Sequence, residues 1–407
     1  MKVSAAIVFT FFSVLRGSLG AFIWDSFKQL DFASLANDNG GGKQFAESSN
    51  LQYDLLELHK KLIVHDSITN NEGDIGDFLA NYLKSKGLTV ELIPVENGSD
   101  SSAERFNVYA YLGSKRDTKV LLTSHIDTVP PYLPYFVQDN KIYGRGSCDA
   151  KASVAAQIVS FLELLEDGEI SEGDVALLYV VGEEYDGIGM KAASTYLEPI
   201  KSSWKAVIFS EPTENKLGVG HKGILAAKIS VNGKSAHSGY PELGRNANNI
   251  LIGVLEKLIN LQLPASDLLG ESTLNIGKIN GGMALNVIPS YAEADILIRV
   301  ASDLKEIKEL IEDIVLKDNQ EQYIHLEFLV DISEQYLKYD IPGFETVILN
   351  YSTDVGNLDV DVEKVKKYLY GPGSILVAHS DNEYVEVDTL TRAVEDYKKL
   401  VNYTLVH

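Results

Sequence analysis

The segment Lys119-Val-Leu-Leu-Thr-Ser-His-Ile-Asp-Thr-Val129 joins a short apolar run directly to two polar side chains, His125 and Asp127. The run predicts a buried β-strand that ends at His125. Residues two apart on a strand face the same side, so Asp127 can accept a hydrogen bond from the far ring nitrogen of His125 and fix its orientation. Taken alone, the segment is equally typical of a capped strand end at the surface.

The same arrangement recurs twice along the chain. The apolar run 174–181 is followed by Glu183, and the run 205–209 is followed by Glu211. Strands that alternate with helices indicate an α/β fold with a mainly parallel sheet flanked by helices. Ligands bind at the carboxyl ends of the strands in such sheets, where these polar residues fall. The other elements expected around them are helices over 51–64, 72–86 and 150–165 and strands over 88–95 and 106–112.

A second domain is expected as an insertion into the first. Its elements follow the order strand, helix, strand, strand, helix, strand, which is typical of a two-layer α+β unit. The chain is therefore predicted to form a discontinuous catalytic domain, residues 51–221 and 335–407, interrupted by a lid or dimerisation domain, residues 222–334. After the insertion we expect a helix over 362–370, a strand over 374–377 that ends at His379, and a final helix from Asp388 to about Tyr403.

Composition narrows the class of protein. A chain of 407 residues is longer than one core usually supports, which favours two domains. The formal net charge of −22 argues against binding of nucleic acid or of an acidic membrane surface. The single cysteine, Cys148, excludes an intramolecular disulfide and is expected to be a small buried residue.

The N-terminus is typical of a secretory signal. Lys2 precedes an apolar stretch over 3–15, and small residues follow at Gly20 and Ala21. We predict a signal peptide over residues 1–20 and a flexible lead-in or pro-segment over 21–50. An uncleaved anchor is the alternative, but the apolar stretch is short for a bilayer. Sequons at Asn97, Asn350 and Asn402 fit a secreted, extracellular glycoprotein.

Further residues of metal-binding or acid–base type complete the candidate site. Asp149 follows a glycine-rich turn, Glu183 and Glu184 are adjacent, and His379 follows the last predicted strand. Structural interpretations exist for two of these features, since Asp149 could cap a helix and the Glu pair could form a solvated acidic turn. A set of histidines and carboxylates without thiolates suits zinc at a hydrolytic centre.

The chain resembles the metallopeptidase family that includes acetylornithine deacetylase, succinyl-diaminopimelate desuccinylase, aminoacylase and glutamate carboxypeptidase. The resemblance runs from Leu51 to the C-terminus. The motifs that carry it are Ser-His-Ile-Asp-Thr-Val-Pro from Ser124, Tyr-Gly-Arg-Gly-Ser-Cys-Asp-Ala-Lys from Tyr143, Gly-Glu-Glu from Gly182, Ser-Glu-Pro-Thr from Ser210, Ser-Ala-His-Ser-Gly-Tyr-Pro from Ser235, Leu-Asn-Val-Ile-Pro from Leu285 and Ala-His-Ser-Asp-Asn-Glu-Tyr-Val from Ala378.

The resemblance implies a role for each candidate. It implies two Zn²⁺ ions per subunit, with Co²⁺ or Mn²⁺ as alternatives, Asp127 as the residue that orients the site, and Glu183 as general base and then acid. In the lid, His237 would stabilise the oxyanion, and Asn286 and Arg299 would contact substrate. The metal ligands implied are His125 and Glu211 for one ion, Glu184 and His379 for the other, and Asp149 between them.

A secreted carboxypeptidase is the function these implications favour. The fixed positive fork of Arg299 suits a free C-terminal carboxylate, on a peptide or an N-acyl amino acid. A deacylase of the acetylornithine deacetylase type is the first alternative, and a silent zinc-binding relative is the second. The resemblance also allows a homodimer through the lid. Two departures are Ala150, where the family often has Met, and the segment 350–355, which differs from the family's glycine-rich segment.

Overall fold

The computed structural model describes residues 44–96, 104–316 and 322–407, with side chains from residue 53 onward. The predicted signal peptide, nearly all of the lead-in and the sequon at Asn97 lie outside these ranges. Apart from the first turns of α2 (Gln44–Val64), the elements below belong to the compact unit Leu55–His407. Within the described residues no helix is both long enough and apolar enough to cross a membrane.

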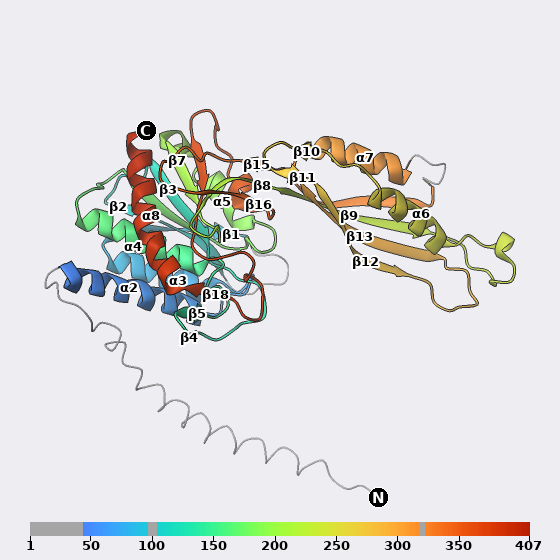
Figure 1. Ribbon diagram of the computed structural model, residues 1–407, viewed down its shortest axis with the longest axis horizontal. Coiled ribbons are helices and arrows are strands. Elements are labelled where there is room, and N and C mark those ends of the chain that lie inside the picture. Colours follow the sequence, from blue (N-terminus) through green and yellow to red (C-terminus); the bar gives the residue numbers. More distant parts are fainter. Residues whose placement is uncertain (1–43, 97–103, 317–321) are drawn as a thin grey trace, which may run out of the picture. The chain divides into compact units, whose positions relative to one another are not determined.

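A six-stranded sheet forms the body that carries the strand ends singled out above (Figure 1). Its three neighbouring pairs β6–β3, β3–β7 and β7–β17 are parallel, whereas β1–β2 and β2–β6 are antiparallel. The sheet is therefore mainly parallel, as predicted. Its strand order is β1 (Leu88–Val95), β2 (Arg105–Leu112), β6 (Val175–Val180), β3 (Val120–His125), β7 (Ala206–Phe209) and β17 (Lys366–Leu369).

Both faces of this sheet are buried, which explains why its central strands are continuously apolar. Side chains of β3 alternate between the two faces, so Leu122 joins one core and Leu121 the other. The first core is completed by α2, α3 (Gly73–Ser85), α4 (Lys151–Glu166) and α8 (Val387–Val406), of which α4 and α8 pack side by side (Figure 1). The second core includes α5 (Ile188–Tyr196) and the 3-10 helix Glu198–Ser203.

The inserted unit has the predicted βαββαβ order. Its four strands form one antiparallel sheet, and its two helices pack on that sheet around a separate apolar core. The order in the sheet is β12-β13-β9-β14. The elements are β9 (Gly223–Asn232), α6 (Ala247–Ile259), β12 (Thr273–Gly281), β13 (Tyr291–Val300), α7 (Leu304–Leu316) and β14 (Ile324–Ile332).

The remaining strands are short and pair into small additional sheets. One three-stranded sheet has the order β15-β8-β16, another has the order β18-β5-β4, and β10 pairs with β11. Their bounds are β4 (Phe136–Gln138), β5 (Lys141–Tyr143), β8 (Leu217–His221), β10 (Ala265–Ser266), β11 (Gly270–Glu271), β15 (Gln335–Tyr336), β16 (Thr346–Leu349) and β18 (Tyr384–Glu386); short 3-10 helices span Pro241–Leu243 and Asp354–Asn357.

Two predicted elements after the insertion were wrong. Residues 362–370 form no helix, because 366–369 extend as β17 beside β7 and bury Tyr368 and Leu369 on opposite faces. Residues 374–377 form no strand, because the chain turns there, with the Val377 amide donating to the Ser374 carbonyl at 3.2 Å. A short apolar run does not distinguish a strand from a helix or an apolar turn. The final helix also begins one residue early, at Val387 rather than Asp388.

Candidate metal centre

Three neighbouring parallel strands deliver the central residues of the site. His125 ends β3, Glu183 lies three residues after β6, and Glu211 lies two residues after β7. Because β6, β3 and β7 run in the same direction side by side, their carboxyl ends meet at one edge of the sheet. Ligand-type atoms of these three residues lie within 4.8 Å of one another.

Asp149 lies between two histidines that come from distant parts of the chain. One carboxylate oxygen is 3.0 Å from Nε2 of His125, and the other is 3.2 Å from Nε2 of His379. The helix that follows begins at Lys151 with Ala150 as its N-cap, and no side chain caps it. Asp149 therefore does not serve as a helix cap, and its two oxygens are directed to the two imidazoles.

The two adjacent glutamates have different surroundings. Both carboxylate oxygens of Glu184 approach Nε2 of His379, at 2.9 and 3.1 Å. Glu184 also forms a second ligand-type group with His125 and Asp149, again within 4.8 Å. The carboxylate of Glu183 makes no hydrogen bond within the described part of the chain.

Asp127 holds the turn that carries these glutamates. Its Oδ1 accepts the backbone N–H of Glu183 at 3.0 Å, and its Oδ2 accepts that of Glu184 at 3.2 Å and the Thr69 hydroxyl at 2.8 Å. Nδ1 of His125 is 3.5 Å from the Asp127 carboxylate but 3.0 Å from its backbone carbonyl. The carboxylate thus orients the Glu183–Glu184 turn more directly than it orients His125, a connection that strand geometry alone could not reveal.

Several carboxyl groups are buried close together in the cluster, and each disfavours the ionisation of the others. Burial and the neighbouring carboxylates raise the pKa of Glu183 and of Glu211 well above the usual range, and burial next to Asp149 raises the pKa of Glu184 to about 7. Hydrogen bonds with Asp149 and Glu184 raise the pKa of His379 to about 10. Carboxylates held this closely would be stabilised by cations.

The donor set fits zinc. The two groups of ligand-type atoms supply imidazole nitrogens and carboxylate oxygens, which are ordinary zinc ligands in hydrolytic sites. Cys148, adjacent to Asp149, is fully buried, and burial raises the pKa of its thiol well above its usual value. A thiolate ligand is therefore disfavoured, in agreement with the interpretation of Cys148 as a small buried residue.

Asp354 is a buried acid beside the cluster that the sequence did not assign to the site. It lines a cavity of about 10 Å³ together with His125, Glu183 and Glu211. Its Oδ1 accepts a hydrogen bond from Asn357 at 2.7 Å, and its Oδ2 has no hydrogen-bond partner in the part of the chain that the structure describes. The only signal for it in the sequence is its place in the segment 350–355, which departs from the family pattern.

The three residues predicted to lie in a lid are found on the inserted unit, and two of them are neighbours. His237 forms a β-bridge with Val287, and the Ser238 amide donates to the carbonyl of Asn286 at 3.0 Å. Both His237 and Asn286 are exposed. In the described residues, no hydrogen bond or ion pair links either of them, or Arg299, to the metal-type cluster.

Arg299 lies on β13 and is half-buried. Its guanidinium has no carboxylate or carbonyl partner among the residues that the structure describes, and burial lowers its pKa. A half-buried guanidinium without a counter-ion is suited to an external carboxylate.

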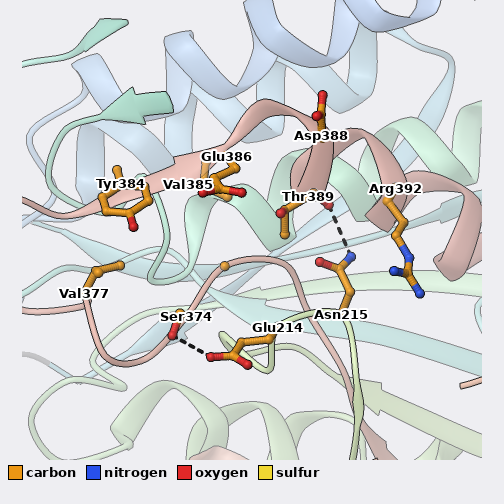
Figure 2. Close-up of a pocket in the computed structure, with 11 residues that line it drawn as sticks. Glu214, Asn215, Ser374, Val377, Tyr384, Val385, Glu386, Asp388, Thr389 and Arg392 are labelled. Atoms are coloured by element: carbon orange, nitrogen blue, oxygen red, sulfur yellow. Dashed lines mark hydrogen bonds between the residues drawn. The ribbon is translucent and has the colours of Figure 1, made fainter. Parts of the chain in front are cut away.

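A larger cavity lies beside the loop that carries His379, as Figure 2 shows. Its volume is about 400 Å³, and Ser374 donates to Glu214 at 2.8 Å on its wall. On another side Asn215 donates to the backbone carbonyl of Thr389 at 3.2 Å. None of the metal-type residues lines this cavity, so it is distinct from the cluster.

Comparison with known proteins places the chain among peptidases. Residues 219–322 match the family model described as a peptidase dimerisation domain. The fold is similar to that of a tripeptidase from Staphylococcus aureus, with a TM-score of 0.73 at 21% identity, covering 88% of this chain and 99% of that one. The fold is also that of a dinuclear metal-binding peptidase from Bacillus subtilis, with a TM-score of 0.66 at 14% identity, covering 88% and 99%.

Two curated relatives are closer in sequence. A probable carboxypeptidase of Aspergillus flavus is 44% identical over 379 residues, which cover 86% of this chain and 90% of that protein. A peptidase M20 domain-containing protein of Schizosaccharomyces pombe is 50% identical over 351 residues, which cover 86% of this chain and 85% of that protein. The predicted fold class and the family resemblance are thereby confirmed, and the chain belongs to the M20 peptidase family.

Proposed function

We propose that this protein is a di-zinc metallohydrolase that removes the C-terminal amino acid from peptides. The observation that carries the proposal is Asp149, whose two oxygens are directed to His125 and His379 while Glu183 lies beside the same cluster. A single carboxylate placed between two histidines suits a pair of cations better than one.

We assign the metal ligands as the family resemblance implies, and the contacts support the assignment. His125 and Glu211 would hold one cation, Glu184 and His379 the other, and Asp149 would be shared. When bound, such cations polarise a carbonyl group and lower the pKa of a water molecule. Asp127 would keep Glu183 and Glu184 directed at the cluster through their backbone amides.

Glu183 is the residue we assign to proton transfer. Its carboxylate is adjacent to the cluster and, within the described residues, is not engaged by any hydrogen bond. It would take a proton from the attacking water and then donate it to the leaving amine. Glu184, one residue on, is held by His379 and is less suited to this exchange.

Substrate recognition would come from the inserted unit. The guanidinium of Arg299, which has no partner among the described residues, would bind the free carboxylate at the C-terminus of a peptide. His237 and Asn286, which are neighbours in that unit, would contact the carbonyl group of the scissile bond. The Aspergillus flavus relative, named as a probable carboxypeptidase, supports this choice over a deacylase.

We also propose that the protein is secreted and that it dimerises through the inserted unit. The proposal of dimerisation is supported by the match of residues 219–322 to a peptidase dimerisation domain. The proposal of secretion is supported by the apolar stretch over 3–15. Of the two described sequons, Asn350 is exposed, whereas the amide nitrogen of Asn402 donates to Glu169. Asn350 would therefore be the better glycan acceptor.

The test is to incubate the zinc-loaded protein with three substrates and to measure the hydrolysis of each. The substrates are a blocked dipeptide with a free C-terminus, its C-terminal amide, and N-acetylornithine. Cleavage of the free acid but not of the amide is the expected result. Preferential release of acetate would instead establish a deacylase. Absence of turnover on all three, with zinc bound, would favour the silent zinc-binding relative. Glu183→Ala is the control for contaminating peptidases.

A further inference from the structure

We infer that Glu383 and Arg145 form a buried clamp that positions the Asp149 carboxylate and ties its turn to the loop of His379. This inference rests on the proposed metal centre and adds two positioning residues to it. Both side chains are buried, with exposed fractions of 0% for Glu383 and 2% for Arg145, and their ion pair spans 2.7 Å.

Strand pairing explains why these two residues meet. The turn that carries Asp149 leaves β5 at Tyr143, and the loop of His379 enters β18 at Tyr384. Tyr143 pairs with Tyr384 in an antiparallel ladder, and the Gly144 amide continues it by donating to the carbonyl of Glu383 at 3.3 Å. The ladder therefore places Glu383 directly beside the turn that leads to Asp149.

The Glu383 carboxylate then binds the turn itself. Its Oε1 accepts the backbone N–H of Cys148 at 3.0 Å and that of Asp149 at 3.1 Å, while its Oε2 accepts the Nη1–H of Arg145 at 2.7 Å. Bonds from two consecutive amides to one charged oxygen fix the backbone from which the Asp149 side chain extends.

Arg145 extends the same clamp to the second histidine. Its Nη1 also donates to the carbonyl of Ser380, one residue after His379, at 3.2 Å, and its Nε donates to the carbonyl of Pro131 at 3.2 Å. The guanidinium thus links the loop of His379 to the segment that follows Asp127. The other ion pair between the turn of Asp149 and the loop of His379 is formed by those two residues themselves, at 3.2 Å.

Metal affinity is therefore expected to depend on Glu383 and Arg145, although neither contacts the side chain of a proposed metal ligand. Partners that orient ligands from outside the coordination sphere typically change metal affinity by about 10- to 100-fold when they are removed. We expect Glu383→Gln to weaken zinc binding by a factor in this range. The Gln side chain has one acceptor oxygen, which can serve either the Cys148 and Asp149 amides or Arg145. If the oxygen keeps the two amides, the NH₂ group faces the Arg145 guanidinium, which is also a donor.

The experiment is competition for zinc between the full-length protein and a chromogenic chelator, with thermal unfolding of the metal-free form as the test of folding. Glu386→Gln is the matched control, because this residue is three positions further along, exposed, and on the rim of the cavity in Figure 2. Glu163→Gln controls for loss of a buried carboxylate, since Glu163 pairs with Lys398 at 3.1 Å near the opposite end of α4.

The expected result is weaker zinc binding in Glu383→Gln alone, with kcat reduced and KM changed less than threefold. A folded Glu383→Gln protein that binds zinc as tightly as the wild type would overturn the inference. If that variant does not fold, Arg145→Lys carries the same test, because it keeps the positive charge but loses the Nε–H bond to Pro131. Failure of the wild type itself to bind zinc would refute the proposed function instead.

Discussion

Replacement of Asp127 by Asn tests how the Glu183–Glu184 turn is held. The carboxylate accepts three hydrogen bonds, from the amides of Glu183 and Glu184 and from the Thr69 hydroxyl. Asn has one acceptor oxygen, so it can keep the Glu184 and Thr69 bonds only by directing its NH₂ group at the Glu183 amide. Burial opposes its ionisation, but the contacts with His125, the Thr69 hydroxyl and the Glu183 amide together lower the pKa of Asp127, so the carboxylate is charged near neutral pH.

The magnitude follows from these three bonds. A hydrogen bond to a charged group contributes about 1.5–3 kcal/mol, and a bond between neutral groups about half as much. One lost bond and two weakened ones therefore correspond to about 4 kcal/mol of local stabilisation. Displacement of a catalytic group by about 1 Å lowers the rate by about 100-fold, so we expect kcat of Asp127→Asn to fall at least that far.

The assay combines kcat on a free-acid dipeptide with urea unfolding of the metal-free protein. The matched control is Asp186→Asn in the same turn, where an exposed carboxylate accepts the Ile188 amide at 3.0 Å. We expect that control to change the free energy of unfolding by no more than about 0.5 kcal/mol. A kcat for Asp127→Asn within threefold of the wild type would refute the role assigned to Asp127.

Three further predictions follow from the same structure. Glu183→Gln is expected to lower kcat by about 10²- to 10⁴-fold while zinc content, measured by mass spectrometry, stays unchanged, and loss of zinc would contradict the assignment. Arg299→Met is expected to lower kcat/KM for a free-acid peptide by about 10- to 100-fold, and an equal loss on the C-terminal amide would argue against carboxylate recognition. Burial lowers the pKa of His59 to about 3 and that of His221 to about 4, so both stay neutral in the folded protein while the unfolded chain protonates near pH 6.5. The free energy of unfolding of the metal-free protein should therefore decrease as pH falls below about 6.5. In urea titrations, His59→Gln should reduce the slope of this free energy against pH by up to about 1.4 kcal/mol per pH unit. An unchanged slope would contradict the neutral state of His59.

The strand ends could be predicted from the sequence because the signal is local. A buried parallel strand is continuously apolar, and a polar residue directly after it must lie at the carboxyl edge of the sheet. For this reason His125, Glu183 and Glu211 are found together in the structure. The order of elements in the inserted unit could be predicted for a similar reason, because burial alternates from residue to residue along its strands β9 and β13.

Contacts between distant segments could not be predicted in this way. His379 was expected to end a strand, but it lies in a turn with a positive φ of 61°, ten residues after Leu369, which ends β17. The bonds from Asp127 to the glutamate turn and the clamp at Glu383 depend on which loops pack together. These contacts join residues 56 positions apart at Asp127 and more than 200 positions apart at Glu383, and no local pattern encodes which segments meet.

The most direct test of the account is anomalous diffraction at the zinc edge from crystals of the zinc-loaded protein. The account predicts two zinc peaks on either side of the Asp149 carboxylate, one next to His125 and Glu211 and the other next to Glu184 and His379. A single peak, or zinc bound away from Asp149, would contradict the proposed two-metal centre.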